Sequence, residues 1–107
     1  MMQSNEIQQR FTQIENSIRQ LKQAVQSQQN VPQDLQDCVQ QLDQQTTQTR
    51  QALQSDDESR IVQCVDTLEQ TSDRAKASLG KTQVDESVRQ AVMQAHSELS
   101  MLKHQLH

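Results

Sequence analysis

Apolar and small residues recur at alternating steps of four and three along four separate stretches of this chain. Steps of this size keep side chains on one stripe of an α-helix, as in the heptad pattern of packed helices. Polar residues, many of them glutamine, occupy the positions between them. The pattern predicts four amphipathic helices, whose stripe residues are Ile7, Phe11, Ile14, Ile18, Leu21, Val25; Leu35, Val39, Leu42, Thr46, Thr49, Leu53; Ile61, Val65, Leu68, Ser72, Ala75, Leu79; and Val88, Val92, Ala95, Leu99, Leu102, Leu106.

The first boundary between helices carries residues typical of helix ends. Ser4 or Asn5 can cap a first helix that runs to about Gln29. Asn30-Val31-Pro32 separates it from a second helix, because proline is tolerated in the first turn of a helix and not in its interior. The second helix is expected to end near Gln54.

The other two boundaries are also marked in the sequence. Ser55-Asp56-Asp57-Glu58 has the spacing of a capping box, in which the serine hydroxyl and the glutamate carboxylate accept from each other's backbone N–H groups. Gly80 suits the left-handed residue that commonly follows a helix. Thr82, followed by acidic residues at 85 and 86, can open the last helix. Turns are therefore expected near Asn30, Ser55 and Gly80.

These turns predict an all-α fold, an up-down-up-down antiparallel four-helix bundle that forms a single domain over residues 1–107. Stripe residues equidistant from a turn then meet in layers, such as Ile18, Leu42, Leu68 and Ala95. The alternative is a long helical hairpin that assembles as an oligomer, with one helix continuing through Asp57. Continuity would put this carboxylate on the apolar seam, where it is costly unless paired, so the sequence favours the break.

Three stripe positions carry hydroxyls, namely Thr46, Thr49 and Ser72. We expect these hydroxyls to donate to a backbone carbonyl one turn earlier, so that a methyl or methylene group faces the core. The alternative is that Thr46 and Thr49 mark a weakly packed stretch of the second helix that exchanges partners. Nothing in the sequence favours this alternative.

Composition narrows the possible partners. The net charge is −4, the single aromatic residue is Phe11, and no basic residue occurs between Lys22 and Arg50, so binding to nucleic acid is not expected. Of the 24 glutamines, 18 precede Ser55, but they are spread between stripe positions as an uncharged helix surface. No apolar run approaches the ~20 residues of a membrane span, and the first residues do not resemble a signal peptide. The expected location is cytoplasmic.

Cys38 and Cys64 each directly precede a stripe residue and are interpreted as small apolar residues at the edge of the core. Measured from the turn near Ser55, their positions along the bundle differ by roughly 12 Å at helical rise. A disulfide needs Cα atoms within about 7 Å, so no bridge is expected within one chain.

All three histidines fall in the last stretch of the chain. Ala95-His96-Ser97-Glu98-Leu99 is similar to the start of the motif of histidine phosphotransfer domains, helical bundles in which an exposed imidazole accepts phosphate. That family usually has Lys and Gly two and three positions after its histidine, where this chain has Glu98 and Leu99. The resemblance implies His96 as the phosphate acceptor, without the cation that steadies the phosphate.

The sequence predicts no metal, cofactor or small-molecule site. His104 and His107 share a helix face, but the adjacent positions offer no third ligand of the kind that zinc sites need. The carboxylates of Asp56, Asp57 and Glu58 lie in an expected exposed turn, and helix capping accounts for them. With no catalytic residues evident, an enzyme is not expected.

The leading hypothesis is a non-enzymatic helical module, comparable to adaptors or helical chaperones, that binds a protein partner or assembles with itself. Histidine phosphotransfer through His96 is the alternative. Met93, Ser97 and Met101 mark the expected partner-binding surface, because the methionines lie two turns apart on the outward face of the last helix and no charge interrupts them. Methionine adapts to varied surfaces. The apolar residues expected outside the core are Val31, Val62, Ala77, Met93 and Met101.

Overall fold

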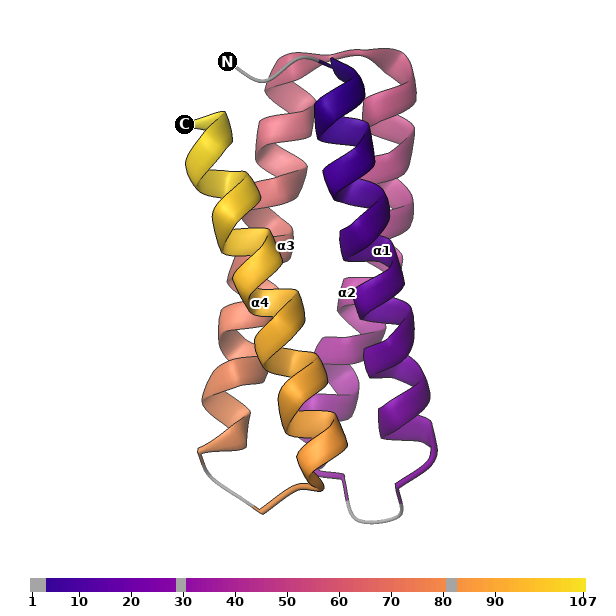
Figure 1. Cartoon of the computed structure of the whole chain (residues 1–107), viewed down its shortest axis with the longest axis vertical. Coiled ribbons are helices and arrows are strands. Elements are labelled where there is room, and N and C mark those ends of the chain that lie inside the picture. The colour runs from indigo at the N-terminus through magenta and orange to yellow at the C-terminus, as the bar shows by residue number, and fades with distance from the viewer. Residues whose placement is uncertain (1–3, 29–30, 81–82) are drawn as a thin grey trace.

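The computed structural model describes residues 4–28, 31–80 and 83–107, which form four α-helices. These are α1 (Ser4–Gln26), α2 (Gln33–Ser55), α3 (Glu58–Leu79) and α4 (Glu86–Leu106). Successive helices run in opposite directions, and each helix packs against two neighbours: α1 and α3 both contact α2 and α4 (Figure 1). The bundle measures 40 × 20 × 18 Å. The predicted up-down-up-down four-helix bundle is therefore confirmed.

The stripe residues form the core of this bundle. Every one of them is buried except Leu106, which is partly buried in the last turn of α4 and packs against the core. Phe11, Leu35, Leu42 and Leu99 have no exposed surface. Because the stripe of each helix faces the centre, the core is a single column enclosed by all four helices.

The three stripe residues with hydroxyl groups are buried in the core, and each hydroxyl makes a hydrogen bond there. Thr46, Thr49 and Ser72 each donate to a backbone carbonyl three or four residues earlier, at 2.7 Å in all three cases. The expected arrangement is confirmed, and it leaves the rest of each side chain available for packing. The core also contains three hydroxyl residues that the stripe pattern does not include: Ser17, Thr71 and Ser78.

The chain reverses between α2 and α3 within two residues. Asp56 has a left-handed backbone (φ 57°), and Asp57 caps α3 by accepting from the Arg60 N–H at 3.2 Å. This break excludes the continuous helix and the long hairpin. The capping box expected from Ser55 and Glu58 is wrong, because Ser55 is still helical and its hydroxyl donates back into α2 at 3.0 Å. Asp56 and Asp57 together make the reversal, so the N-cap of α3 is Asp57 and not the expected Ser55.

The connection between α1 and α2 differs from expectation in the end of α1 and in the burial of Val31. α1 ends at Gln26, before the expected Gln29, and Pro32 occupies the N-cap position of α2 with an extended backbone. The expected turn residue Asn30 lies outside the described residues. Val31, expected outside the core, is buried. Val31 lies in the connection and packs against the core. A helical pattern of apolar residues does not predict burial at a position outside the helices.

The connection between α3 and α4 is longer than expected. Gly80 is right-handed (φ −75°), so the predicted left-handed conformation is wrong; several residues are available to turn the chain. Thr82 lies outside the described residues. Asp85 caps α4 by accepting from the backbone and side chain of Ser87, and these two hydrogen bonds lower the pKa of its carboxyl.

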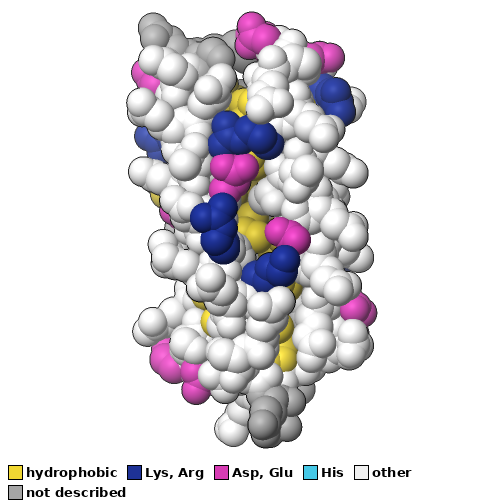
Figure 2. Space-filling model, turned by 90° about the vertical axis from the view of Figure 1, so that its right-hand side faces the viewer, with side chains coloured by type: hydrophobic (Ala, Val, Ile, Leu, Met, Phe, Trp, Pro, Cys, Tyr) yellow, Lys and Arg dark blue, Asp and Glu magenta, His cyan; other side chains and the backbone are white. Residues whose placement is uncertain are grey.

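Ion pairs line two of the contacts between neighbouring helices, and we call each line of pairs an ionic seam. Between α1 and α2, Lys22 pairs with Asp43 (3.1 Å) and Arg50 pairs with Glu15 (2.5 Å). Figure 2 shows basic and acidic side chains gathered along the middle of this face, with hydrophobic side chains visible beneath them. A second ionic seam joins α3 and α4. Each charged residue of these pairs directly follows a stripe residue in the sequence, which places it beside the core.

Candidate functional site

The outward face of α4 carries two exposed methionine side chains. Among the described residues, Met93 and Met101 are the large hydrophobic side chains that are exposed, at 42% and 53%. Ser97 is exposed between them, and His104 is exposed one turn further on. The structure therefore places Met93, Ser97 and Met101 together on an uncharged outward strip, as the sequence predicts. Their role in binding stays a prediction.

The other apolar residues expected outside the core do not extend this strip. Val31 is buried, Val62 is partly buried, and Ala77 is exposed but belongs to α3. We refer to Met93, Ser97 and Met101 as the α4 methionine strip.

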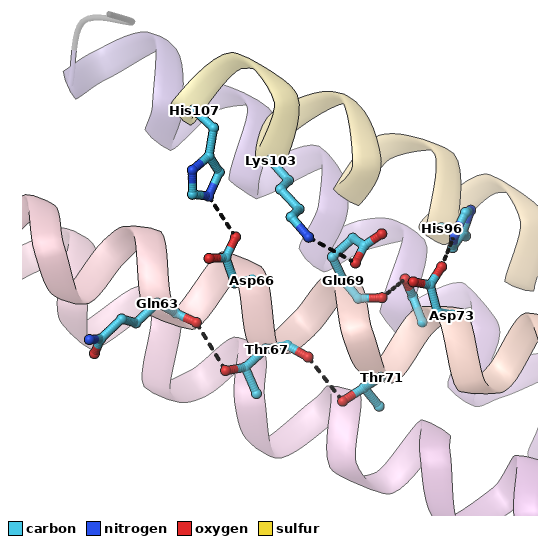
Figure 3. Close-up of polar contacts among 10 residues, drawn as sticks. Gln63, Asp66, Thr67, Glu69, Thr71, Asp73, His96, Lys103 and His107 are labelled. Carbon is cyan, nitrogen blue, oxygen red and sulfur yellow. Dashed lines mark hydrogen bonds and ion pairs between the residues drawn. The ribbon is translucent and has the colours of Figure 1, made fainter.

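The ionic seam between α3 and α4 was not anticipated from the sequence. Acidic side chains of α3 face basic side chains of α4 and that of His107, the residue that follows α4 (Figure 3). The pairs are Asp73 with His96, Glu69 with Lys103 (3.5 Å), and Asp66 with His107 (2.9 Å). The acidic members follow stripe residues in α3 and the basic members follow stripe residues in α4. Charged residues that repeatedly follow stripe residues are therefore a sequence pattern from which this seam could be predicted.

Three ligand-bearing side chains meet in the middle of this seam: Glu69, Asp73 and His96, here called the carboxylate–histidine cluster. One nitrogen or oxygen atom from each lies within 4.8 Å of the other two. His96 Nε2 contacts the Asp73 carboxylate directly. The side chains of His96 and Glu69 are only 16% and 13% exposed, whereas that of Asp73 is 54% exposed. The cluster therefore consists of two carboxylates and an imidazole, of which Glu69 and His96 are largely covered and Asp73 is exposed.

His104 and His107, for which the sequence predicts no metal site, are not part of this cluster. His104 is exposed, and His107 pairs with Asp66. The sequence next to the histidines on their own helix offers no carboxylate that accounts for the cluster. The carboxylates that approach His96 come instead from α3, more than 20 positions earlier in the chain.

The surroundings of His96 bear on the phosphotransfer alternative. Its imidazole is largely covered and faces the carboxylates of Asp73 and Glu69. The nearby ammonium of Lys103 is already paired with Glu69. Two carboxylates repel an anionic phosphoryl group and attract a cation. The geometry gives no specific support to phosphate acceptance at His96.

Cys38 of α2 and Cys64 of α3 both lie at the contact between these two helices. They are free thiols, as predicted. Cys38 is buried and Cys64 partly buried. Burial raises the pKa of the Cys38 thiol; Arg74 opposes this effect, and the carboxylates of Asp34 and Asp37 add to it. A buried thiol that resists ionisation is a poor nucleophile, so Cys38 contributes packing.

A groove of about 520 Å³ lies between α1 and α2. Glutamines line most of it, together with Lys22, Asp37 and Asp43, and Val25 and Val39 contribute its apolar part. This lining contains no histidine, cysteine or hydroxyl-bearing nucleophile beside a base. The groove offers hydrogen bonds and charges for binding but no evident catalytic chemistry.

Comparisons of this chain with protein-family models, with curated proteins and with solved structures gave no match. Among the described residues, none of the helices is long and apolar enough to cross a membrane.

Proposed function

We propose that this chain is a non-enzymatic helical interaction module that assembles with itself or binds a protein partner through the α4 methionine strip. The observation that carries this proposal is the exposure of Met93 and Met101 on one outward face, while nearly every other large apolar side chain of the described residues is enclosed. Methionine is flexible and polarisable, so it adapts to the surface that it meets. The serine between them costs little to desolvate compared with a charged residue.

The size of the strip sets the expected strength of binding. A stable protein–protein interface covers about 800 Å² of each partner, which is more than one helix face of 21 residues supplies. The contact must therefore extend onto neighbouring surface. Because glutamines make much of that surface polar, we expect weak, concentration-dependent association rather than an obligate complex.

Self-association provides the direct test because it needs no second component. The mass of the chain in solution is measured by sedimentation equilibrium across concentrations from the micromolar to the millimolar range. The wild-type mass is expected to rise with concentration. The double variant Met93→Glu/Met101→Glu is expected to remain a single chain, because two added carboxylates would have to be buried in the contact.

A matched control separates the strip from a general effect of charge. Gln44→Glu/Gln51→Glu adds the same two charges to exposed positions of α2 with a similar spacing, and should associate like the wild type. Far-UV circular dichroism should show equal helicity in all three proteins. A wild-type chain that stays monomeric throughout contradicts self-assembly. If capture of a protein partner is also unchanged in the methionine variant, the whole proposal fails.

A further inference from the structure

The carboxylate–histidine cluster has a chemistry that the interaction module does not use. We infer that Glu69, Asp73 and His96 bind a divalent transition-metal ion, with zinc as the best match. The three ligand atoms already lie within 4.8 Å of one another, so one ion can contact all of them after small side-chain movements. They come from two helices that pack side by side (Figure 3).

The bundle core holds the backbone of this cluster in place. Glu69 follows Leu68, Asp73 follows Ser72, and His96 follows a buried alanine. Leu68 is fully buried and Ser72 is 1% exposed. Each ligand is thus attached one residue away from a packed core position. Sites built on rigid elements lose little further freedom when the ion binds.

The electrostatics of the cluster favour a cation. Glu69 and Asp73 are four residues apart on α3, a spacing at which like charges repel. Glu69 is largely shielded from water, which strengthens the effect of its charge. The Lys103 ammonium meets part of this demand from 3.5 Å, but its side chain is 38% exposed and can withdraw into solvent. A doubly charged ion between the carboxylates would satisfy both at once.

The ligand types point to zinc among the common divalent ions. Zinc accepts imidazole nitrogen and carboxylate oxygen together, and sites with three protein ligands leave a fourth position for water. Asp73 is the exposed member of the cluster, so solvent reaches this side of a bound ion. Magnesium and calcium prefer sets made of oxygen ligands, in larger number for calcium. Cobalt is a suitable spectroscopic substitute because it binds the same kinds of ligand.

The seam also contains a His–Asp pair that has no third ligand in the described part of the chain, and this pair serves as a control for zinc binding. His107, which directly follows α4, and Asp66 of α3 make the same kind of contact across the seam, at 2.9 Å. Among the residues that the structure describes, no third ligand joins this pair. If His–Asp pairs alone were enough, both would bind zinc equally. The inference requires that the cluster with Glu69 bind zinc and that the His107 pair contribute nothing.

The experiment uses the full chain without an affinity tag, after removal of metal by chelation. Zinc chloride is titrated in by calorimetry, and cobalt binding is followed by visible absorption. One zinc per chain is expected, with loss of about tenfold or more in affinity for His96→Gln and for Asp73→Asn. His107→Gln should bind like the wild type. Lys103→Met should bind several-fold more tightly, because the competing ammonium is gone.

Two readouts make the result decisive. Saturating zinc should raise the unfolding temperature of the wild type and of His107→Gln but not of His96→Gln, because binding to the folded state stabilises it. Helicity measured without metal shows that each variant is folded, and Asp73→Asn replaces His96→Gln if the latter is not. Absence of zinc binding by the wild type overturns the inference. So does equal zinc affinity in His96→Gln and His107→Gln, or loss of binding in Lys103→Met.

Discussion

Arg50 of α2 and Glu15 of α1 form a two-pronged ion pair across the bundle surface. Arg50 Nη2 lies 2.5 Å from Glu15 Oε1, and Nε lies 3.2 Å from Oε2. The guanidinium also lies 5.1 Å from the centre of the Phe11 ring, which is fully buried. Arg50 therefore lies over the buried Phe11 ring while its charge is compensated by Glu15 of the neighbouring helix.

Replacing this arginine should destabilise the fold more than replacing an exposed partner of the same seam. We expect Arg50→Ala to lower the free energy of unfolding by about 1–2 kcal/mol, through loss of the ion pair and of the contact with Phe11. Lys22→Ala breaks the Lys22–Asp43 pair, whose side chains are about half exposed, and should cost at most ~0.5 kcal/mol. Urea unfolding measures both. Equal losses would show that Arg50 is only a surface charge.

The buried Thr49 hydroxyl should be dispensable. It donates only to a carbonyl of its own helix, so Thr49→Val exchanges a buried hydroxyl for a methyl group in the core. We expect a gain of about 1 kcal/mol in unfolding free energy. Thr47→Val, at an exposed position two residues away, should change stability by less than ~0.5 kcal/mol. A loss on Thr49→Val would assign this hydroxyl a role beyond its own helix.

The start of α3 offers a test of which residue caps it. Asp57→Ala should lower the unfolding free energy by about 1 kcal/mol, because the Arg60 N–H loses its acceptor. Ser55→Ala should cost less than ~0.5 kcal/mol, since the Ser55 hydroxyl bonds within α2. Thermal and urea unfolding of the two variants distinguish them. The reverse order would support the Ser55 capping box instead of the observed turn.

The two thiols should differ in reactivity. Cys38 is buried and its pKa is raised, so a thiol reagent should label Cys64 first in the folded chain. Mass spectrometry of the partly labelled protein identifies the site. Preferential labelling of Cys38 would contradict its placement in the core.

The raised pKa of Cys38 also predicts how stability depends on pH. Folding favours the protonated thiol, so its contribution is complete at neutral pH and is lost as pH rises through the raised pKa. Urea unfolding between about pH 7.5 and pH 10 should show a decline that is smaller in Cys38→Ala. An identical decline in both proteins would assign the alkaline loss to other groups.

Much of the fold follows from local patterns. The step of four and three is a property of helix geometry, so it specified which side chains face the core, from Ile7 in the first turns to Leu102 near the end. Helix boundaries were less predictable. Ser55 and Gly80 have the right residue types for capping, but the length of the reversal decides which residue occupies the capping position.

The sequence alone placed the methionine strip, because residues opposite an apolar stripe must face outward wherever the helix packs. It did not place the carboxylate–histidine cluster. An apolar stripe points to the bundle centre whichever neighbour lies on either flank, so periodicity does not say which helix faces His96. Only the tertiary structure decided that α3 lies on that flank, bringing Glu69 and Asp73 to a histidine more than 20 positions away in the chain.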